Sequence, residues 1–338
     1  MFVTCRFSTA GRGVHPICQV LGRSDEARNT LQQRSSMSIY VELLVRASMD
    51  ALWSHTQTPA LHERWDLRFS RIEYVPRNDE AEPQRFHYST RIGFGLEVSG
   101  QGETVGRRDS SDGSSTSALK FGSDEPLSII TEGSGYWKYI PTKDGVRFLT
   151  WYDYRTRFGA VGACFDRLIF RPLIGWATAW SFDRLRLWLE RDVAPEQAIR
   201  QSMIHTISRV GLAAVFIYHG LIPKLLTRNV DEIAMVRDAG VAAAVAGSTV
   251  TALGILELSF AAALLVAWRR RWPLFVCLAL MLLATAAVGM NSPRYFSAAF
   301  NPFTLNLAVA CLASIDLMVV GRIPSAARCL RHRGPDKA

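Results

Sequence analysis

The sequence has few cysteines for its length and none of the short motifs that carry well-known chemistry. Its six cysteines are scattered over 338 residues without a C-x-x-C pair, so neither a disulfide framework nor a zinc site is expected. There is no Walker loop, no H-E-x-x-H, no G-x-S-x-G, and no G-x-G-x-x-G after a strand-like segment. We therefore expect no metal, no cofactor and no catalytic residues.

The basic charge of the chain indicates a membrane more than a nucleic acid. The formal net charge is +9, and much of the excess lies in the first 36 residues and beside long apolar segments. The sequence has neither zinc-finger spacing nor a dense basic and aromatic strip, so we expect no nucleic-acid partner. This distribution is typical of membrane topology and of contact with anionic lipid.

Four long apolar segments fill the last third of the chain, at 207–226, 249–268, 272–290 and 302–320. Each has about 18–20 residues, which is the length that crosses a hydrocarbon core of roughly 30 Å. Helices of water-soluble bundles keep a polar face, which the second and third segments barely have. We therefore expect an integral membrane protein whose C-terminal part is an all-α four-helix transmembrane bundle in contact with the lipid bilayer.

The basic residues predict how this bundle is oriented. Arg269, Arg270 and Arg271 join the second and third segments, and a basic tail at 322–338 follows the fourth. In a four-span protein these two places and the N-terminal region share one side, and the positive-inside rule makes it the cytoplasm. We expect a bacterial inner-membrane protein with both termini and its soluble domain in the cytoplasm.

The N-terminal half predicts a soluble α+β domain over 37–191. Residues 1–36 are rich in Arg and Ser and lack an apolar h-region, so they are not a secretory signal. They are a disordered basic tail, an organellar presequence, or residues upstream of a start at Met37, which we favour. Alternating strand-like runs follow, with a polar Gly/Ser loop expected at 106–117. A long helix at 161–190 and a linker helix within 192–203 then lead to the membrane domain, 204–321.

Polar residues inside the spans predict one shared cluster. Glu257 near a span centre costs roughly 2.5–3.5 kcal/mol on the insertion scale, so it is expected to face the bundle interior. At about 1.5 Å per residue it lies roughly 12–16 Å deep from the outer surface, and His219 roughly 10 Å. We expect Glu257 to approach His219 or Lys224, with Asn301 and Asn306 completing the hydrogen bonds. A structural clasp and a site for a small ligand, a quinone headgroup or a proton both stay open.

The order of elements in the soluble half resembles the START-like (SRPBCC) fold, a helix-grip α+β architecture. The resemblance covers about 37–191 and depends on Trp65 after the short helices and on GSGYWKYIPTKDGVRFLTWYDY at 133–154, followed by the long helix. In that superfamily a curved sheet wraps the last helix and leaves an apolar cavity. The resemblance implies binding of a lipid or other apolar small molecule. We expect the cavity to be lined by Trp65, Phe94, Trp137, Phe148, Trp151 and Tyr154. The tryptophans of the helix, Trp176, Trp180 and Trp188, would either pack on the sheet or rest at the membrane interface.

The membrane half resembles the DoxX-like family of small four-span proteins over about 204–321. The residues that carry this resemblance are YHGLIPK at 218–224, Glu257 and NPFTLN at 301–306. Some broader relatives are named for association with quinol oxidase or thiosulfate–quinone systems, which implies an alternative function as an accessory subunit of a quinone-linked redox system. An enzyme is a third interpretation, because some START-like domains catalyse cyclisation or hydrolysis, but no acid–base pair stands out. The oligomeric state is not predicted.

Overall fold

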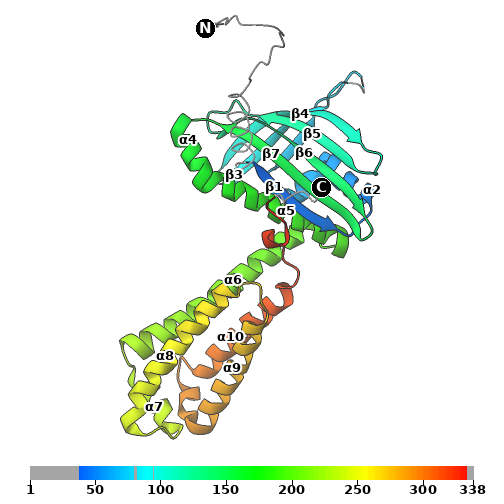
Figure 1. The fold of residues 1–338 in the computed structure, drawn as a ribbon. Coiled ribbons are helices and arrows are strands. Elements are labelled where there is room, and N and C mark those ends of the chain that lie inside the picture. The colour runs from blue at the N-terminus through cyan, green and yellow to red at the C-terminus, as the bar shows by residue number, and fades with distance from the viewer. Residues whose placement is uncertain (1–37, 80–81, 94, 333–338) are drawn as a thin grey trace, which may run out of the picture.

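A computed structural model describes residues 38–79, 82–93 and 95–332. The predictions for residues 1–36, for a start at Met37 and for Phe94 lie outside these ranges. A domain built on a curved sheet stands on a bundle of long helices (Figure 1). The predicted fold class is confirmed, since a helix-grip α+β domain is followed by four helices long and apolar enough to cross a membrane.

The sheet has seven antiparallel strands in the order β1-β7-β6-β5-β4-β3-β2. The strands are β1 (Ile39–Val45), β2 (Arg71–Tyr74), β3 (Arg85–Gly93), β4 (Leu96–Asp109), β5 (Ser115–Gly122), β6 (Ile130–Thr142) and β7 (Gly145–Thr156). Strands β2 to β7 follow one another as a meander, and β1 adds to the edge beside β7. Gly145 has a φ of 136° in the β6–β7 turn, a conformation that glycine adopts without strain.

The predicted polar loop at 106–117 is wrong over most of its length. Strand β4 continues to Asp109 and β5 begins at Ser115, so that only residues 110–114 connect them. The ladder pairs Gly106 with Ala118 and Arg107 with Ser117. Pairing along this long hairpin outweighs the low strand propensity of Gly, Ser and Asp, because strand preference depends strongly on the neighbouring strands.

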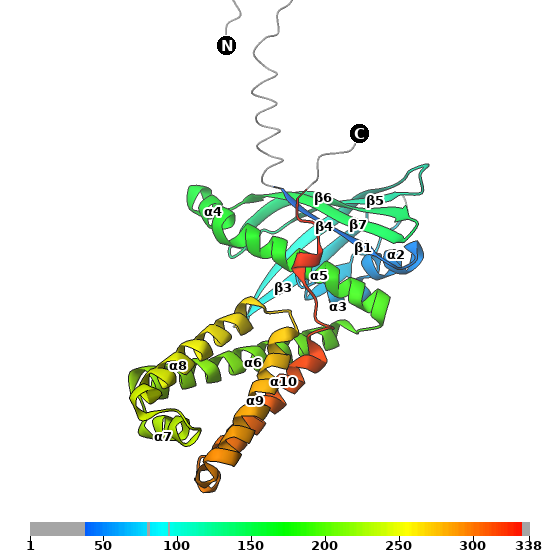
Figure 2. The same cartoon turned by 60° about the horizontal axis from the view of Figure 1, so that its bottom comes forward.

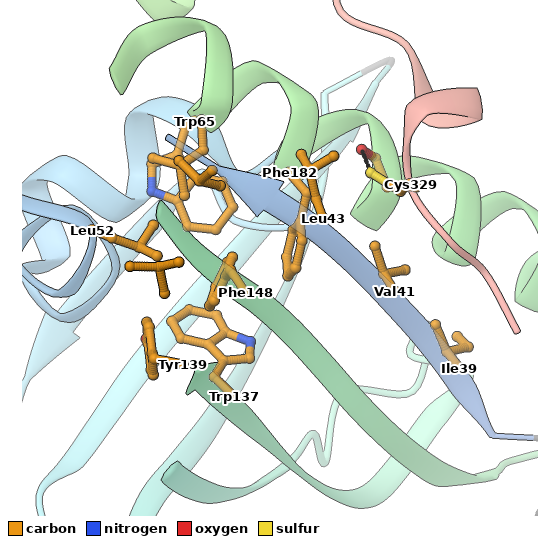
Figure 3. Packing of buried hydrophobic residues seen from close by; sticks show 14 of the residues in the cluster. Ile39, Val41, Leu43, Leu52, Trp65, Trp137, Tyr139, Phe148, Phe182 and Cys329 are labelled. Carbon is orange, nitrogen blue, oxygen red and sulfur yellow. Dashed lines mark hydrogen bonds between the residues drawn. The ribbon is translucent and has the colours of Figure 1, made fainter. Parts of the chain in front are cut away.

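The helices of the soluble domain lie against the concave face of the sheet. They are α2 (Met49–Gln57), α3 (Pro59–Trp65), α4 (Gly159–Phe165), the π-helix η1 (Asp166–Phe170) and α5 (Arg171–Arg191). Ser48 caps α2 by accepting a hydrogen bond from the Ala51 amide (3.2 Å). Helix α5 crosses the sheet, and its Phe182 ring stacks on Phe148 of β7 at 4.5 Å between centroids (Figure 3). Trp180 and Trp188 pack partly buried against this core, whereas Trp176 is exposed.

The membrane helices are α6 (Pro195–His219) with its π-helical extension η2 (Gly220–Leu226), α8 (Ala243–Val266), α9 (Trp272–Asn291) and α10 (Pro302–Val319). The linker helix expected within 192–203 and the first span are one continuous helix, since α6 runs for 25 residues from Pro195. Helix α7 (Val230–Asp238) and the 3-10 helix η3 (Pro293–Ser297) connect the spans at the end far from the sheet (Figure 2).

The chain after the last span returns to the soluble domain. This segment, residues 323–331 with the 3-10 helix η4 (Ala326–Arg328), is called the C-terminal clasp below. Leu330 pairs with Glu42 of β1 through two backbone hydrogen bonds of 2.9 Å each. The buried Asp183 of α5 accepts a hydrogen bond from the Ser325 amide (2.7 Å), and the Cys329 thiol donates to the Ala179 carbonyl (3.2 Å). The clasp thus pairs with the free edge of β1 at Glu42 and joins the bundle to the sheet.

Candidate functional site

A cavity of about 520 Å³ lies between the sheet and helices α3 and α5. Its volume falls within the range of small-molecule pockets, roughly 300–1,000 Å³. Helix α5 closes one side with Leu173, Ile174 and Ala177. Most of the remaining wall is also apolar, and it includes Phe69, Ile72, Phe86, Tyr88, Val98, Leu119, Phe121, Trp137, Tyr152 and Phe170.

Of the five predicted aromatic residues that the structure describes, one lies at the cavity wall. That residue is Trp137. Trp65 and Phe148 are fully buried in the core instead. Tyr154 donates a hydrogen bond to Asp166 (2.7 Å), and Trp151 stacks on the neighbouring strand while its indole N–H donates to Ser38 (2.8 Å).

Strand alternation explains most of this difference. Phe148, Thr150, Tyr152 and Tyr154 share the inner face of β7, so Trp151 must point to the outer face. Counting by twos along the predicted strand removes Trp151 from the wall and adds Tyr152, which does line the cavity.

The polar end of the cavity is a buried ionic network around Asp66. Its Oδ2 atom lies 2.6 Å from Arg68 Nη2 and 3.1 Å from His62 Nε2, and both partners line the cavity. Burial by itself would raise the pKa of Asp66, but the charge of Arg68 and the hydrogen bonds from His62 and Arg68 outweigh it and hold this pKa well below its usual range. The wall therefore presents a fixed, internally neutralised ion pair.

The π-helix η1 builds a second ion pair, between Asp166 and Arg171. Asp166 and Arg171 are five residues apart, a spacing that an α-helix meets only loosely. The wider π-turn sets them on one side, and Arg171 Nε lies 2.7 Å from Asp166 Oδ2. Arg171 also contacts Asp153 of β7 (2.9 Å), so this pair fixes the start of α5 on the sheet.

Lys224 is the centre of an ionic cluster near the far end of the bundle. Its Nζ atom lies 3.1 Å from Glu257 Oε1 and 3.1 Å from Glu232 Oε1. The structure thus joins two of the five predicted residues, Lys224 and Glu257. Glu232 was missed because residues 227–248 read as an outer loop, although they contain helix α7.

The other three residues of the predicted cluster do not complete its hydrogen bonds. Asn301 caps α10, where its side chain accepts from the Thr304 amide (2.9 Å), because the first turn of a helix leaves amides without partners. Asn306 donates to Thr285 of α9 (3.1 Å). His219 lies edge-on against Tyr218.

Two glycines set the distance across which Lys224 meets Glu257. A Cβ atom on Gly254 would lie 2.8 Å from the Gly220 carbonyl oxygen, and one on Gly220 would lie 2.7 Å from the Gly254 carbonyl oxygen. The two backbones therefore touch, as small residues allow at membrane helix crossings. Pro223 lies within η2, where its missing N–H fits an irregular turn.

A second membrane cluster, near the soluble domain, was missed from the sequence. Asp316 of α10 is fully buried and lies 2.5 Å from His205 Nδ1 and 2.8 Å from Arg209 Nε, both on α6. Arg209 Nη2 donates to the Arg270 carbonyl between α8 and α9 (2.9 Å). Among the described residues, His205 Nε2 and Arg209 Nη1 have no hydrogen-bond partner. The lone carboxylate in the apolar run 302–320 was the available signal for this cluster.

Known proteins resemble both halves of the chain. Residues 213–314 match the DoxX-like family. The "Uncharacterized membrane protein YndG" of Bacillus subtilis (strain 168) is 50% identical over 183 residues, which cover 54% of this chain and 68% of YndG. The chain belongs to the same family as YndG. Within this DoxX-like membrane protein, Gly220, Lys224 and Glu257 all lie inside the matched residues.

Two solved structures match the soluble half at low identity. A STAR-related lipid transfer protein from Xanthomonas axonopodis is 15% identical, has a TM-score of 0.32, and is matched over 40% of this chain and 79% of that one. The Zhui aromatase/cyclase from Streptomyces sp. R1128 is 12% identical, has a TM-score of 0.31, and is matched over 44% and 94%. The START-like architecture of this DoxX-like protein lies in its own strand order and its long helix α5. Among the described residues there is no group of three His, Cys, Asp or Glu that could hold a metal ion.

Proposed function

We propose that this protein is a membrane-anchored binding module whose START-like domain, 37–191, holds a lipid or other apolar small molecule. The observation that carries the proposal is the cavity of about 520 Å³ with mainly apolar walls. Protein interiors are close-packed and leave few voids larger than a water molecule. An apolar space of this size is therefore best explained by a ligand that fills it.

The polar end of the cavity narrows the class of ligand. Arg68 is already paired with Asp66, so the wall offers no uncompensated positive charge to a carboxylate or phosphate. The aromatic and aliphatic walls favour hydrocarbon or fused rings. The ligand that fits is an apolar molecule with at most an uncharged polar group, such as a hydroxyl or a carbonyl.

The membrane domain, 204–321, is proposed to anchor the module with its soluble domain in the cytoplasm of a bacterial cell. The support is the basic segment Arg269–Arg270–Arg271, which lies at the same end of the bundle as the soluble domain. The Lys224 cluster then lies in the outer half of the bilayer. Its salt bridges link η2, α7 and α8, which favours a structural clasp over a redox role.

Recovery of bound ligand tests this function. The full chain is purified in detergent and in lipid nanodiscs, denatured, and its extract analysed by mass spectrometry. The Ala177→Trp variant fills the cavity from α5 and is expected to lose the ligand. Ala118→Trp is the matched control, because residue 118 lies on β5 between two cavity-facing residues, Ser117 and Leu119, and points to the outer face. Preparations that are repeatedly ligand-free in wild type and control alike would refute the function.

A further inference from the structure

The N-terminal part of the long helix carries an unusual apolar surface. We call Phe158, Val161, Phe165, Leu168, Ile169 and Leu173, all exposed, the apolar ridge. The structure describes every residue from 158 to 176, and Arg167 is the one charged side chain exposed in this stretch. Single exposed apolar residues are ordinary, but a contiguous group of this kind marks an interaction site.

The ridge is continuous with the cavity. Phe165 and Leu173 line the cavity and are still 42% and 57% exposed, so they stand at its mouth. Leu127, which is 61% exposed, and Ile92 line the cavity from the strand side of the same opening. A molecule entering or leaving between these residues would therefore pass over apolar side chains.

The ridge lies in α4, η1 and the first turn of α5, and the other end of this helical stretch leads into the membrane domain. Helix α5 lies on the face of the sheet turned toward the transmembrane bundle, in both views (Figures 1 and 2). It ends at Arg191, and α6, the first membrane helix, begins at Pro195. Trp176, exposed next to the ridge, stacks on Trp180, and indole rings favour the membrane interface. Arg167 adds a positive charge suited to anionic headgroups.

We infer that the apolar ridge rests in the headgroup region of the leaflet on the side of the soluble domain, and that the cavity exchanges its ligand directly with that leaflet. This inference deepens the proposed function and rests on it. It assigns the ligand to the membrane lipids, taken from the same bilayer, and not to molecules dissolved in water. The partner of the apolar ridge is therefore a lipid bilayer that contains anionic headgroups.

A fluorophore on Cys164 tests the contact, because this residue is a free, exposed cysteine in α4, among the ridge residues. In the full chain, Cys5, Cys18 and Cys311 are replaced by Ala, and Cys164 is labelled with an environment-sensitive dye in proteoliposomes of phosphatidylglycerol and phosphatidylethanolamine. Nitroxide lipids are expected to quench this dye. The control carries the dye at Lys120→Cys in a Cys164→Ala background, because Lys120 is exposed on the outer face of the sheet, and it should be quenched at most half as much.

The variant Leu168→Glu with Ile169→Glu is expected to bring quenching at Cys164 down to the control level and to slow the uptake of a fluorescent lipid at least fivefold. A matched Lys120→Glu variant should change neither. Equal, weak lipid quenching at both sites would overturn the inference, as would Cys164–Cys164 crosslinking between two copies. Lipid recovered from the cavity without quenching at Cys164 refutes the membrane contact alone, whereas quenching with an empty cavity refutes the proposed function.

Discussion

The cluster around Asp316 gives a stability prediction that can be worked out from the contacts. Replacing Asp316 with Leu leaves the fully buried Arg209 with one described partner, the Arg270 carbonyl. Breaking a buried ion pair in this way costs about 3–5 kcal/mol. At about 2–4 °C per kcal/mol, the midpoint of thermal unfolding should fall by roughly 6–20 °C.

A thiol-reactive dye measures this change in detergent, because Cys277 is buried in the bundle core next to the cluster. The variants are made in a chain that keeps Cys277 as its single cysteine. Ser314→Leu is the matched control, since it removes a polar group from the lipid-facing side of the same helix. It should leave the midpoint almost unchanged.

The double variant Asp316→Leu with Arg209→Met distinguishes two causes of a lower midpoint in Asp316→Leu. One is the loss of the ion pair, and the other is damage to helix α10 itself. Replacing both partners with apolar groups of similar size removes the stranded charge and should recover most of the loss. If Asp316→Leu unfolds at the temperature of the Ser314→Leu control, or if the double variant is no more stable than the single one, the reasoning about this cluster is wrong.

Three further predictions follow from contacts in both domains. Burial raises the pKa of Cys329 to about 12, so an alkylating agent at pH 8 should modify Cys164 rapidly and Cys329 only after the clasp is detached by denaturant. The pKa of Asp66 lies below its ordinary value, so its stabilising effect is present above about pH 4 and is lost as the pH falls; the difference in unfolding free energy between wild type and Asp66→Asn should be largest at pH 7 and shrink in acid. Gly254→Ala should lower the melting temperature, because its Cβ would lie 2.8 Å from a backbone oxygen, whereas Gly247→Ala on the same helix meets nothing within 4 Å and should be neutral or stabilising.

The sequence was most informative where one physical signal dominates. A run of about 20 apolar residues is the length of a membrane span and is hard to place in a water-soluble fold. The four predicted segments correspond to α6 with η2, α8, α9 and α10. The hairpin at Gly145 and the cap at Ser48 also depend on local chemistry alone. The length of β4 was not predicted, because its ladder partners come from another part of the chain.

The candidate sites were harder to predict because they depend on tertiary contacts. Glu257 was recognised from its cost in lipid, and its contact with Lys224 followed from their similar depth. Glu232 and Arg209 were not predicted to take part in the clusters, because a charged residue near the end of a span is typical of a solvated or interfacial position. The cavity wall was assigned by residue type, and strand parity would have separated Tyr152 from Trp151.

The C-terminal clasp also determines when the edge of β1 can be paired during synthesis of the chain. The ribosome delivers β1 early, but its edge partner, Leu330, is synthesised only after the four spans have been made. Until then the backbone of β1 is an open edge of the kind that pairs with other chains. The soluble domain is therefore completed only after all four spans have been synthesised, and a chain that stops within the spans keeps this sheet edge open to pairing with other chains.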